Sequence, residues 1–498
     1  MSFKVFAGAC CVASLLQLSA HAQSATRDPD EGLLALSSSR VLYNADGQNA
    51  RWNGIGRIKS RKGSHCTATL IDTRSPDSPA DAPAYLVTNG HCISRKNGRI
   101  ITDAPIDGTI QFNFFTDSTA LSYPLKRVRW SSMQGVDLAI VELQTTLDAL
   151  IADGIQPLRL ASQLPEEGRA ILSIGAPMFA GTGHLRMAAC THQYSGAIMQ
   201  QPWVWRHTVR NQCQDISVGS SGSPLLTRDT HEVFAVLNLT NQPSPEDSAL
   251  EDEVTLPPGF PLQVAGSNYG SPITLLNECF VDGLFNPDPV HCSLFPTFTI
   301  TFATQPRQYA KIRLDAEGRE IYPRWNVQFA VDQPFYRYKK VDQPLQCEDP
   351  VGYGNATAAQ DAHIDAPVDA RIGINWLCII GLSAPEARPS LGMMRNALTL
   401  AVELQAAGPT IAPRLHIEKN QFGTYEVHWL HDSSQIDHYT VKIGPAATTD
   451  CSDPQRFKRR LGNHLVLRKK SLPVKICTYA HDVNNQRSSV REDIVTAS

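Results

Sequence analysis

Residues whose types could support nucleophilic catalysis occur at three places along the chain. The stretch Asp215–Leu226, DISVGSSGSPLL, places Ser220 and Ser221 between glycines, just ahead of an apolar run. Gly and Ser are also common loop residues, so this stretch alone is equally typical of a polar turn. A serine hydroxyl becomes a nucleophile when an imidazole accepts its proton and a carboxylate orients that imidazole. The rest of the chain must therefore supply a histidine and an acid.

A histidine and an aspartate stand at suitable positions upstream. His91, in YLVTNGHC, follows an apolar strand-like run and an Asn-Gly turn, and it precedes Cys92. Asp137, in GVDLAIVEL, opens an apolar strand, where an unpaired carboxylate would suffer a large desolvation penalty. Taken singly, a hydrogen-bonded structural histidine and a turn-initiating aspartate are the more ordinary interpretations. The combination in the order His, Asp, Ser favours a catalytic set.

Together, the motifs TNGHC, VDLAI and GSSGSP resemble those of the chymotrypsin-like (trypsin-fold) serine peptidases, T-A-G-H-C, D-I-A-L and G-D-S-G-G-P. The likeness extends over residues 51–290. It implies that Ser221 is the nucleophile, that His91 acts as general base and then acid, and that Asp137 orients His91. It implies no metal and no organic cofactor.

The same resemblance implies an oxyanion hole and raises the question of activation. The backbone N–H groups of Gly219 and Ser221 would form the oxyanion hole. Ser220 departs from the digestive members of the family, which carry there an Asp that pairs with the new N-terminus. The form GSSGSP is closer to the bacterial lysyl- and glutamyl-endopeptidase branch. The bond Arg40–Val41 lies where an activation site would lie, which leaves open a removable pro-segment at 23–40.

Two interpretations of substrate specificity stay open. Asp215 lies ahead of Ser221 where trypsin-like members carry the acid of the primary pocket, which would select Lys or Arg through a charge-assisted bond. A loop role for Asp215 is equally consistent with the sequence. Leu239 and Thr240, in LNLTN, stand where the family has glycines in the pocket wall. Either side chain would narrow the entrance and favour small residues.

The elements that must position these residues are short strands. Apolar, β-branched runs broken by Gly, Pro, Asp and Ser predict an all-β fold, here a double β-barrel peptidase domain over residues 41–295. Beyond it, YRYKKVDQPLQCEDP and HYTVKIGPAATTDCSDP form a weak internal repeat, and each copy is followed by a second cysteine. We therefore predict two β-sandwich modules, 296–405 and 406–498. The second weakly resembles a fibronectin type III or immunoglobulin-like module.

The N-terminus predicts export. Residues 1–22 combine Lys4, an apolar run and small residues at Ala20 and Ala22, the layout of a secretory signal peptide. The apolar run is shorter than the ~20 residues that a membrane span needs, and no other segment is long and apolar enough. We expect the mature protein to be secreted, into the extracellular space or the periplasm.

Export favours disulfide bonds between the cysteines that follow the signal peptide, because disulfides persist in oxidising compartments. A zinc site is the rival interpretation, but no Cys-x-x-Cys pair follows the signal peptide. We therefore predict disulfides between cysteines that are neighbours in the sequence, so that each bond cross-links one local unit. The predicted pairs are Cys66 with Cys92, Cys190 with Cys213, Cys279 with Cys292, Cys347 with Cys378, and Cys451 with Cys477.

Charge limits the classes of partner. A net charge of −3 gives no reason to expect nucleic acid as a partner. The basic stretch Arg456–Lys470 is typical of a solvated face, and the alternative is a site for an anionic surface polymer.

The expected function is a secreted serine endopeptidase that cleaves extracellular proteins or peptides through an acyl-enzyme. The alternative is an exported binding or adhesion protein with an inactive peptidase fold. An α/β-hydrolase is disfavoured, because Ser223 stands where its nucleophile elbow needs Gly.

Overall fold

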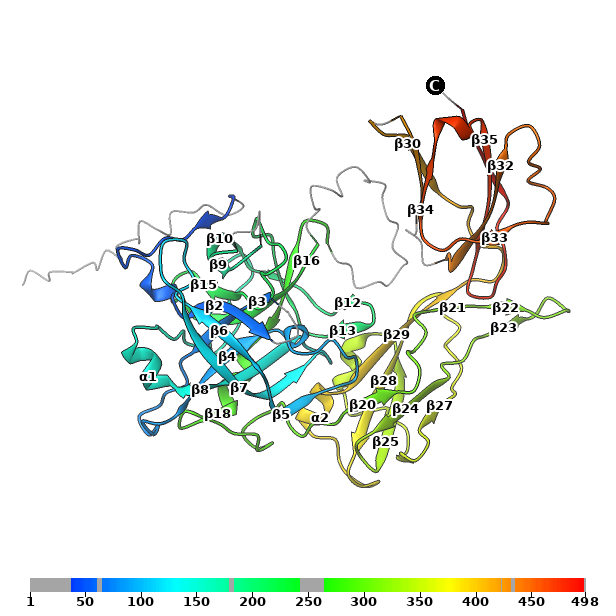
Figure 1. Cartoon of the computed structure of the whole chain (residues 1–498). Helices are drawn as coiled ribbons and strands as arrows, with labels where there is room; N and C mark the ends of the chain where they lie inside the picture. The colour runs from blue at the N-terminus through cyan, green and yellow to red at the C-terminus, as the bar shows by residue number, and fades with distance from the viewer. Residues whose placement is uncertain are drawn as a thin grey trace, which may run out of the picture.

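The computed structural model describes residues 37–60, 65–178, 183–241, 264–421, 423–430 and 435–496. The predicted signal peptide lies outside the described residues, as does the pro-segment up to residue 36. Most regular elements are strands, so the predicted all-β class is confirmed. In Figure 1 the blue-to-green part of the chain forms one large β unit, the light-green-to-yellow part forms a smaller one, and the orange-to-red part forms another.

The first barrel belongs to a seven-stranded sheet, in which six strands close into a ring because β7 pairs with both β6 and β8, and β5 lies beside β7. In spatial order its strands are β5 (Ile101–Pro105), β7 (Leu121–Ser132), β6 (Gly108–Phe112), β2 (Ile55–Ser60), β3 (His65–Ile71), β4 (Pro83–Thr88) and β8 (Leu138–Thr146). Successive side chains of a strand point to opposite faces. In β4, Ala84 and Leu86 therefore fill the barrel, whereas Tyr85 and Val87 face outward into a second core.

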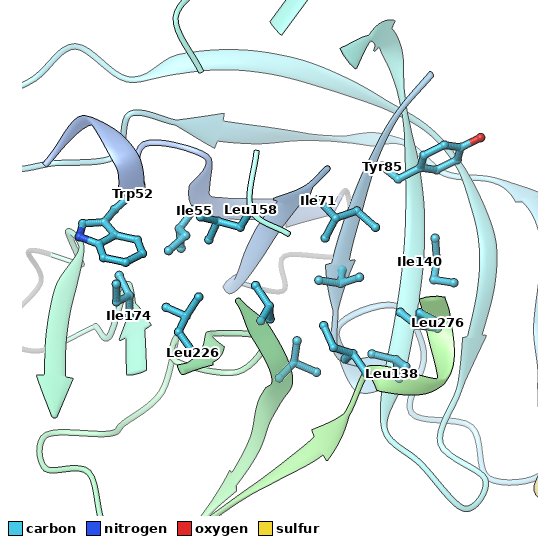
Figure 2. Packing of buried hydrophobic residues seen from close by; sticks show 14 of the residues in the cluster. Trp52, Ile55, Ile71, Tyr85, Leu138, Ile140, Leu158, Ile174, Leu226 and Leu276 are labelled. Atoms are coloured by element: carbon cyan, nitrogen blue, oxygen red, sulfur yellow. The ribbon is translucent and has the colours of Figure 1, made fainter. Parts of the chain in front are cut away.

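An eight-stranded sheet follows, and we call it the half-barrel because its edge strands β1 and β11 are not paired with each other among the described residues. Its order is β1 (Arg40–Val41), β10 (Arg186–Thr191), β9 (Ala170–Gly175), β15 (Pro224–Thr227), β16 (Val233–Thr240), β17 (Asn268–Pro272), β14 (Val209–Asn211) and β11 (Gln193–Tyr194). The core between barrel and half-barrel is shared: Ile71 and Ile140 from one side meet Ile174 and Leu226 from the other (Figure 2). This packing fixes the two units against each other.

The first module, residues 300–405, is built from two main sheets around one core that contains Trp325, Phe329 and Leu377. One sheet is β20 (Ile300–Phe302), β24 (Val327–Val331) and β27 (His363–Ile364). The other is β21 (Tyr309–Lys311), β29 (Leu398–Gln405), β28 (Gly373–Leu382), β25 (Phe335–Val341) and β26 (Thr357–Ala358). The hairpin β22 (Arg313–Leu314)–β23 (Glu320–Ile321) stands apart from both sheets.

The second module, residues 415–496, also has two sheets, and Trp429, Tyr439 and Ile476 belong to its core. One sheet is β30 (Leu415–Lys419), β31 (Tyr425–Trp429) and β34 (His464–Leu467). The other is β33 (Lys458–Arg459), β32 (His438–Pro445), β35 (Val474–His481) and β36 (Arg491–Val495). A buried ion pair, Lys311 Nζ to Asp482 Oδ2 at 2.7 Å, joins this module to the first.

Short elements complete the chain. The hairpins are β12 (Ile198–Gln200)–β13 (Trp203–Trp205) and β18 (Phe280–Val281)–β19 (Leu284–Phe285), and the α-helices are α1 (Leu147–Ala152) and α2 (Leu391–Arg395). The 3-10 helices are η2 (Ala50–Trp52), η3 (Gly90–Cys92), η6 (Thr274–Cys279), η7 (Pro344–Glu348) and η8 (Lys469–Ser471). Of the helices that the structure describes, none has the length and apolar character to span a bilayer.

All five predicted disulfides are confirmed. Each links cysteines that are neighbours in the sequence, so each closes a short loop within one unit of the fold. The bonds are Cys66–Cys92, Cys190–Cys213, Cys279–Cys292, Cys347–Cys378 and Cys451–Cys477. Disulfides at this density are typical of an oxidising extracellular or periplasmic environment.

Candidate active site

The structure brings the predicted histidine and aspartate into direct contact at the end of β4 and the start of β8. The backbone N–H of His91 donates to Asp137 Oδ1 at 2.9 Å, and His91 Nδ1 lies 2.7 Å from Asp137 Oδ2. Asp137 is fully buried, while the His91 side chain keeps 13% of its surface exposed. Because an ionised carboxylate can only accept, Nδ1 carries the proton of the neutral ring and Nε2 keeps its lone pair. His91 is thus prepared to accept a proton at Nε2.

Close backbone packing makes this arrangement possible. Gly90 begins the 3-10 turn η3, and a Cβ at this position would lie 2.0 Å from the carbonyl oxygen of Ser132. Asp137 is held by its own backbone as well. Its N–H donates to Ser271 Oγ at 3.1 Å, and its carbonyl accepts from Asn89 Nδ2 at 3.1 Å. A side chain larger than hydrogen at Gly90 would therefore push η3, and His91 with it, away from the carboxylate.

The serine loop lies against β3. Thr67 N–H donates to the carbonyl of Ser221 at 2.7 Å, and Thr67 Oγ1 donates to the carbonyl of Gly219 at 2.9 Å. Gly222 adopts φ +83°, and a Cβ there would lie 2.0 Å from the carbonyl oxygen of Thr67. Glycine is the residue that tolerates both the positive φ and the close approach. These bonds fix the backbone on both sides of Ser221.

Two backbone N–H groups at Ser221 have no acceptor among the residues that the structure describes. Within the residues that the structure describes, the N–H groups of Gly219 and Ser221 make no hydrogen bond to the protein. Gly219 has φ +95°, and a Cβ there would lie 2.7 Å from the carbonyl oxygen of Ala176. Unpaired N–H groups next to a nucleophile can stabilise the negative charge of a tetrahedral intermediate.

His91 and Ser221 line two cavities in common, one of about 860 Å³ and one of about 260 Å³. No hydrogen bond joins the two side chains in the described part of the chain, although such bonds commonly tighten only when substrate is bound. Gly219 lines the larger cavity, and Leu239 and Thr240 line the smaller one. The structure therefore gathers these predicted site residues around one open region.

Asp215 is not brought to that region. Its carboxylate oxygen Oδ2 accepts from Ser39 N–H at 2.7 Å and from Ser39 Oγ at 2.9 Å. Arg186 donates in turn to Ser39, from Nε to Oγ and from Nη2 to the carbonyl, both at 2.7 Å. Asp215 lines a separate space of only about 10 Å³ together with Ser39 and Arg186. The carboxylate thus anchors the segment that leads into β1, and it does not line either of the cavities shared by His91 and Ser221.

Several lining residues were not predicted from the sequence. Val218, 78% exposed, lines both cavities, and Met133 and Trp203 line the smaller one. Gln200 and Trp203 belong to the hairpin β12–β13, where they pair directly across the two strands. The apolar WVW run at 203–205 was the available signal, but nothing in the sequence relates it to His91.

The other face of this hairpin contacts the first module. Met199 and Val204 pair across β12 and β13, and they pack with Ile374 and Trp376 of β28. Successive side chains of a strand lie on opposite faces, so the two faces of this short hairpin contact different parts of the molecule. Gln200 and Trp203 face the candidate active site, whereas Met199 and Val204 face the module.

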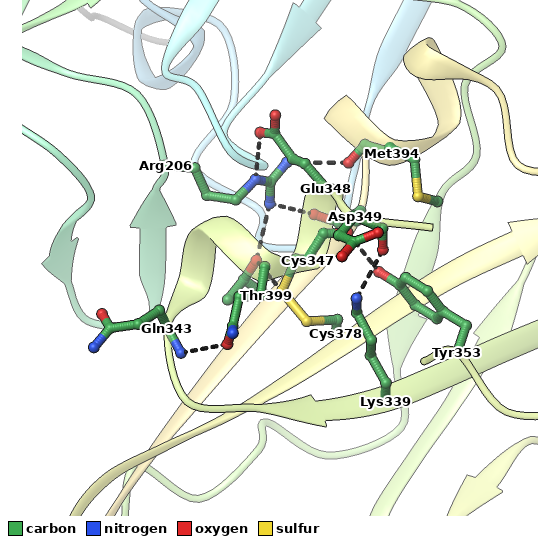
Figure 3. The surroundings of a disulfide bond; sticks show 12 residues. Arg206, Lys339, Gln343, Cys347, Glu348, Asp349, Tyr353, Cys378, Met394 and Thr399 are labelled. Carbon is green, nitrogen blue, oxygen red and sulfur yellow. Dashed lines mark hydrogen bonds and ion pairs between the residues drawn. A yellow bond between two sulfur atoms is a disulfide. The ribbon is translucent and has the colours of Figure 1, made fainter. Parts of the chain in front are cut away.

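Arg206, which directly follows β13, continues this interface. Its side chain is fully buried, and its backbone N–H donates to the carbonyl of Gly135, close to Asp137. The guanidinium donates to Glu348 Oε1 at 2.8 Å, to the Ala397 carbonyl at 2.7 Å, and to Thr399 Oγ1 at 2.9 Å (Figure 3). Every one of these side-chain partners lies in the first module. Five donors in a fixed fork suit Arg to such a site.

The surroundings of Glu348 favour its ionised carboxylate. Desolvation by burial raises the pKa of its carboxyl, but the hydrogen bond with His207 and the charges of Arg206 and His207 outweigh that effect. They lower the pKa from 4.5 to about 2. His207 Nε2 lies 3.0 Å from Glu348 Oε2. The first module is therefore held by a charged network to the segment between β13 and β14, and the neighbouring disulfide Cys347–Cys378 ties η7, which carries Glu348, to β28 (Figure 3).

The candidate active site offers no metal ligand set of its own among the described residues. Ligand atoms of Cys66, His91 and Cys92 lie within 4.8 Å of one another. The two sulfurs are bonded to each other, however, and a disulfide sulfur is not the thiolate that binds a metal.

Comparison with known proteins assigns the core of this region. Residues 66–236 match the family model of the trypsin-like peptidase domain. The matched segment contains His91, Asp137 and Ser221, and it spans strands of both the barrel and the half-barrel. This part of the chain is a trypsin-like serine peptidase fold. No curated protein matches the chain.

Similar solved structures are distant. An inactive mutant form of Rv3671c from M. tuberculosis H37Rv is 16% identical, with a TM-score of 0.29, over 48% of this chain and 91% of that one. The thermostable serine protease AL20 from an extremophilic microorganism is 14% identical, with a TM-score of 0.31, over 45% and 92%. The protease Anisep from Arthrobacter nicotinovorans is 14% identical, with a TM-score of 0.29, over 44% and 90%.

Proposed function

We propose that this protein is a serine endopeptidase in which Ser221 is the nucleophile, His91 the general base and acid, and Asp137 the group that orients His91. One observation carries the proposal. The buried carboxylate of Asp137 binds both the backbone N–H and Nδ1 of His91, while His91 and Ser221 line the same cavities. This leaves Nε2 as the ring nitrogen that can accept a proton.

The chemistry follows from these positions. Ser221 Oγ attacks the scissile carbonyl and passes its proton to His91 Nε2. The N–H groups of Gly219 and Ser221 stabilise the oxyanion, and removal of one such donor typically costs about 10²–10³ in kcat. His91 then protonates the leaving amine, and an acyl-enzyme on Ser221 remains. Water, activated by His91, hydrolyses this ester and restores the serine.

For specificity, the proposal favours small or apolar side chains over Lys and Arg. Leu239, Thr240, Met133 and Trp203 line the smaller cavity, and among the residues that the structure describes no carboxylate lines it. Selection of a basic residue requires an acid that can reach it, and Asp215 is engaged with Ser39 instead. Kinship with the lysyl- and glutamyl-endopeptidase branch stays a prediction from the GSSGSP motif.

The proposal includes export after removal of residues 1–22 and action on extracellular or periplasmic proteins, which is consistent with five disulfides. It leaves the second module as a candidate surface-binding unit of fibronectin type III character. Lys442, Arg456, Lys458 and Arg459 line a hollow of about 870 Å³, which suits an anionic polymer. An inactive adhesion protein remains the alternative function.

A peptide library read by mass spectrometry tests the proposal. The chain from Gln23 should cut peptides, and its Ser221→Ala variant should not. Ser220→Ala is the matched control, because Ser220 is buried and its Oγ accepts a 3.3 Å bond from Ser217 N–H. Retained cleavage by Ser220→Ala identifies Ser221 as the nucleophile. Equal cleavage by wild type and Ser221→Ala would mean that Ser221 is not the nucleophile, and no cleavage by any form would favour the adhesion protein.

A further inference from the structure

The second module carries a row of histidines on the outward face of its three-stranded sheet. His416 of β30 pairs directly with His428 of β31, and His428 pairs with His464 of β34. Glu418 and Glu426 form a second pair beside this row. Their sequence neighbours Tyr425, Val427 and Trp429 face the core, so the alternation of the strands places the imidazoles and carboxylates together on the opposite side.

Three ligand atoms of this face converge. Glu426 Oε2 lies 3.3 Å from His464 Nε2 and 3.7 Å from His428 Nε2. The rings of His428 and His464 are stacked with centroids 4.7 Å apart. All three ligand atoms lie within 4.8 Å of one another. Glu418 Oε1 is 4.0 Å from His428 Nε2, which makes it the nearest further carboxylate.

A neighbouring amide orients the carboxylate. Asn420 Nδ2 donates to Glu426 Oε1 at 2.8 Å. That bond engages one carboxylate oxygen and leaves Oε2 directed at the two imidazoles. Ligating carboxylates in metal sites are commonly held by a hydrogen bond of this kind.

The spacing of the donors suits a small transition-metal ion. Ligands at about 2.0–2.2 Å from a tetrahedral Zn²⁺ are roughly 3.3–3.5 Å from each other. The two carboxylate-to-imidazole distances of 3.3 and 3.7 Å are close to that value. Two imidazole nitrogens and one carboxylate oxygen are also a donor set that Zn²⁺ accepts, with the fourth position left to water or another ligand.

The arrangement has a cost without an ion. Like residues directly opposite each other on a sheet destabilise it when they are charged, and Glu418 faces Glu426. Within the described residues this face gathers three imidazoles and two carboxylates in adjoining cross-strand pairs. A bound cation would offset the repulsion between the carboxylates.

We propose that His428, His464 and Glu426 bind a divalent transition-metal ion, with Zn²⁺ as the best fit, on the outward face of the second module. The site is independent of the proposed peptidase activity. His428 and His464 keep 34% and 43% of their side chains exposed, so the ion would retain a coordination position open to solvent. Glu418 or water would fill that position.

Calorimetric titration with Zn²⁺ tests the site on the chain from Gln23 carrying Ser221→Ala, which prevents self-cleavage. We expect one Zn²⁺ per chain bound by this site, a rise in Tm on Zn²⁺ addition, and at least about a tenfold loss of affinity in the double variant His428→Gln, His464→Gln. His438→Gln is the matched control, since His438 stacks on His481 in the opposite sheet of the same module. It should bind Zn²⁺ as the parent does.

Two results would overturn the proposal. One is a parent chain that takes up no Zn²⁺ at micromolar concentration. The other is Zn²⁺ binding with the same affinity and stoichiometry in the parent and the double variant. Thermal unfolding of the double variant without metal shows whether it folds, and its substituted residues are partly or fully exposed, so we expect the Tm of the metal-free parent.

Discussion

At the scale of single residues, the proposed function depends on how Asp137 holds His91. Replacing Asp137 by Asn keeps the size of the side chain but makes one of the two acceptors a donor. The amide then favours the wrong tautomer of His91, and we expect kcat/KM to fall by about 10³–10⁴. Peptide hydrolysis assays on the purified variant measure this. Asp229→Asn is the control, because Asp229 is exposed, pairs with exposed Arg169 and accepts from the neighbouring Thr230 N–H, so the substitution should leave the rate unchanged.

A second prediction at this scale concerns Asp215. The carboxylate of Asp215 binds Ser39 and lines neither of the cavities that His91 and Ser221 share. Asp215→Asn should therefore leave the cleavage-site preference unchanged. The same variant should lower Tm, since the backbone N–H and Oγ of Ser39 lose an ionised acceptor. Library profiling before and after the substitution is the measurement. A preference for Lys or Arg in the wild type that disappears in Asp215→Asn would contradict the proposed specificity.

Where a motif includes its own local geometry, the sequence indicated which residues lie together, and their catalytic roles stay a prediction. His91, Asp137 and Ser221 sit in motifs whose neighbours, such as Gly90 and Gly222, are required for close backbone contacts. The five disulfides followed from nearest-neighbour spacing. Asp215 could not be placed in this way, because its partner Ser39 lies far away in the chain and no motif connects them.

At the scale of elements, the hairpin β12–β13 links the candidate active site to the first module. Trp203→Ala removes a wall of the smaller cavity, and we expect KM for extended peptides to rise about tenfold, equivalent to about 1.4 kcal/mol. Val204→Ala instead removes packing against Ile374 and Trp376, and should lower the free energy of unfolding by about 1–2 kcal/mol. Steady-state kinetics and urea unfolding separate the two effects.

The test is the difference between Trp203→Ala and Val204→Ala in their effects on KM. If Val204→Ala raised KM as much as Trp203→Ala, the two faces of the hairpin would not have the separate roles that their contacts indicate. The sequence did not predict that the hairpin β12–β13 contacts both the candidate active site and the first module. A strand of three residues has too little alternation to reveal which face is buried against which partner.

At the scale of the whole molecule, the first module is docked onto the peptidase unit by a buried interface. The sequence predicted separate modules that follow one another, and it gave no sign that Arg206 reaches into the first module. Burial of an arginine depends on partners that the fold brings together, here Glu348 and the carbonyls of Arg395 and Ala397. Such partners leave no local pattern.

This interface predicts a dependence of stability on pH. The pKa of Glu348 is lowered to about 2 in the folded protein. A carboxyl with a depressed folded pKa stabilises the fold above its unfolded pKa of 4.5, and this stabilisation is lost as the pH falls through about 2. Its upper limit is about 3 kcal/mol. Glu348→Gln should therefore show a shallower fall of Tm between pH 6 and pH 2.5 than the wild type.

Differential scanning calorimetry over that pH range measures the effect. Glu317→Gln is the control, because Glu317 is an exposed carboxylate in the same module and should leave the slope unchanged. Parallel slopes for the wild type and Glu348→Gln would mean that the network around Arg206 does not contribute to acid stability.

The most direct test of the central claim is covalent labelling of the full chain from Gln23 with a fluorophosphonate probe, followed by peptide mass spectrometry. A nucleophilic serine displaces fluoride and keeps the phosphonyl group. We predict one adduct per chain, located on Ser221, present in Ser220→Ala and absent from Ser221→Ala and from the denatured protein. An unlabelled chain, or an adduct on a serine other than Ser221, would contradict the account.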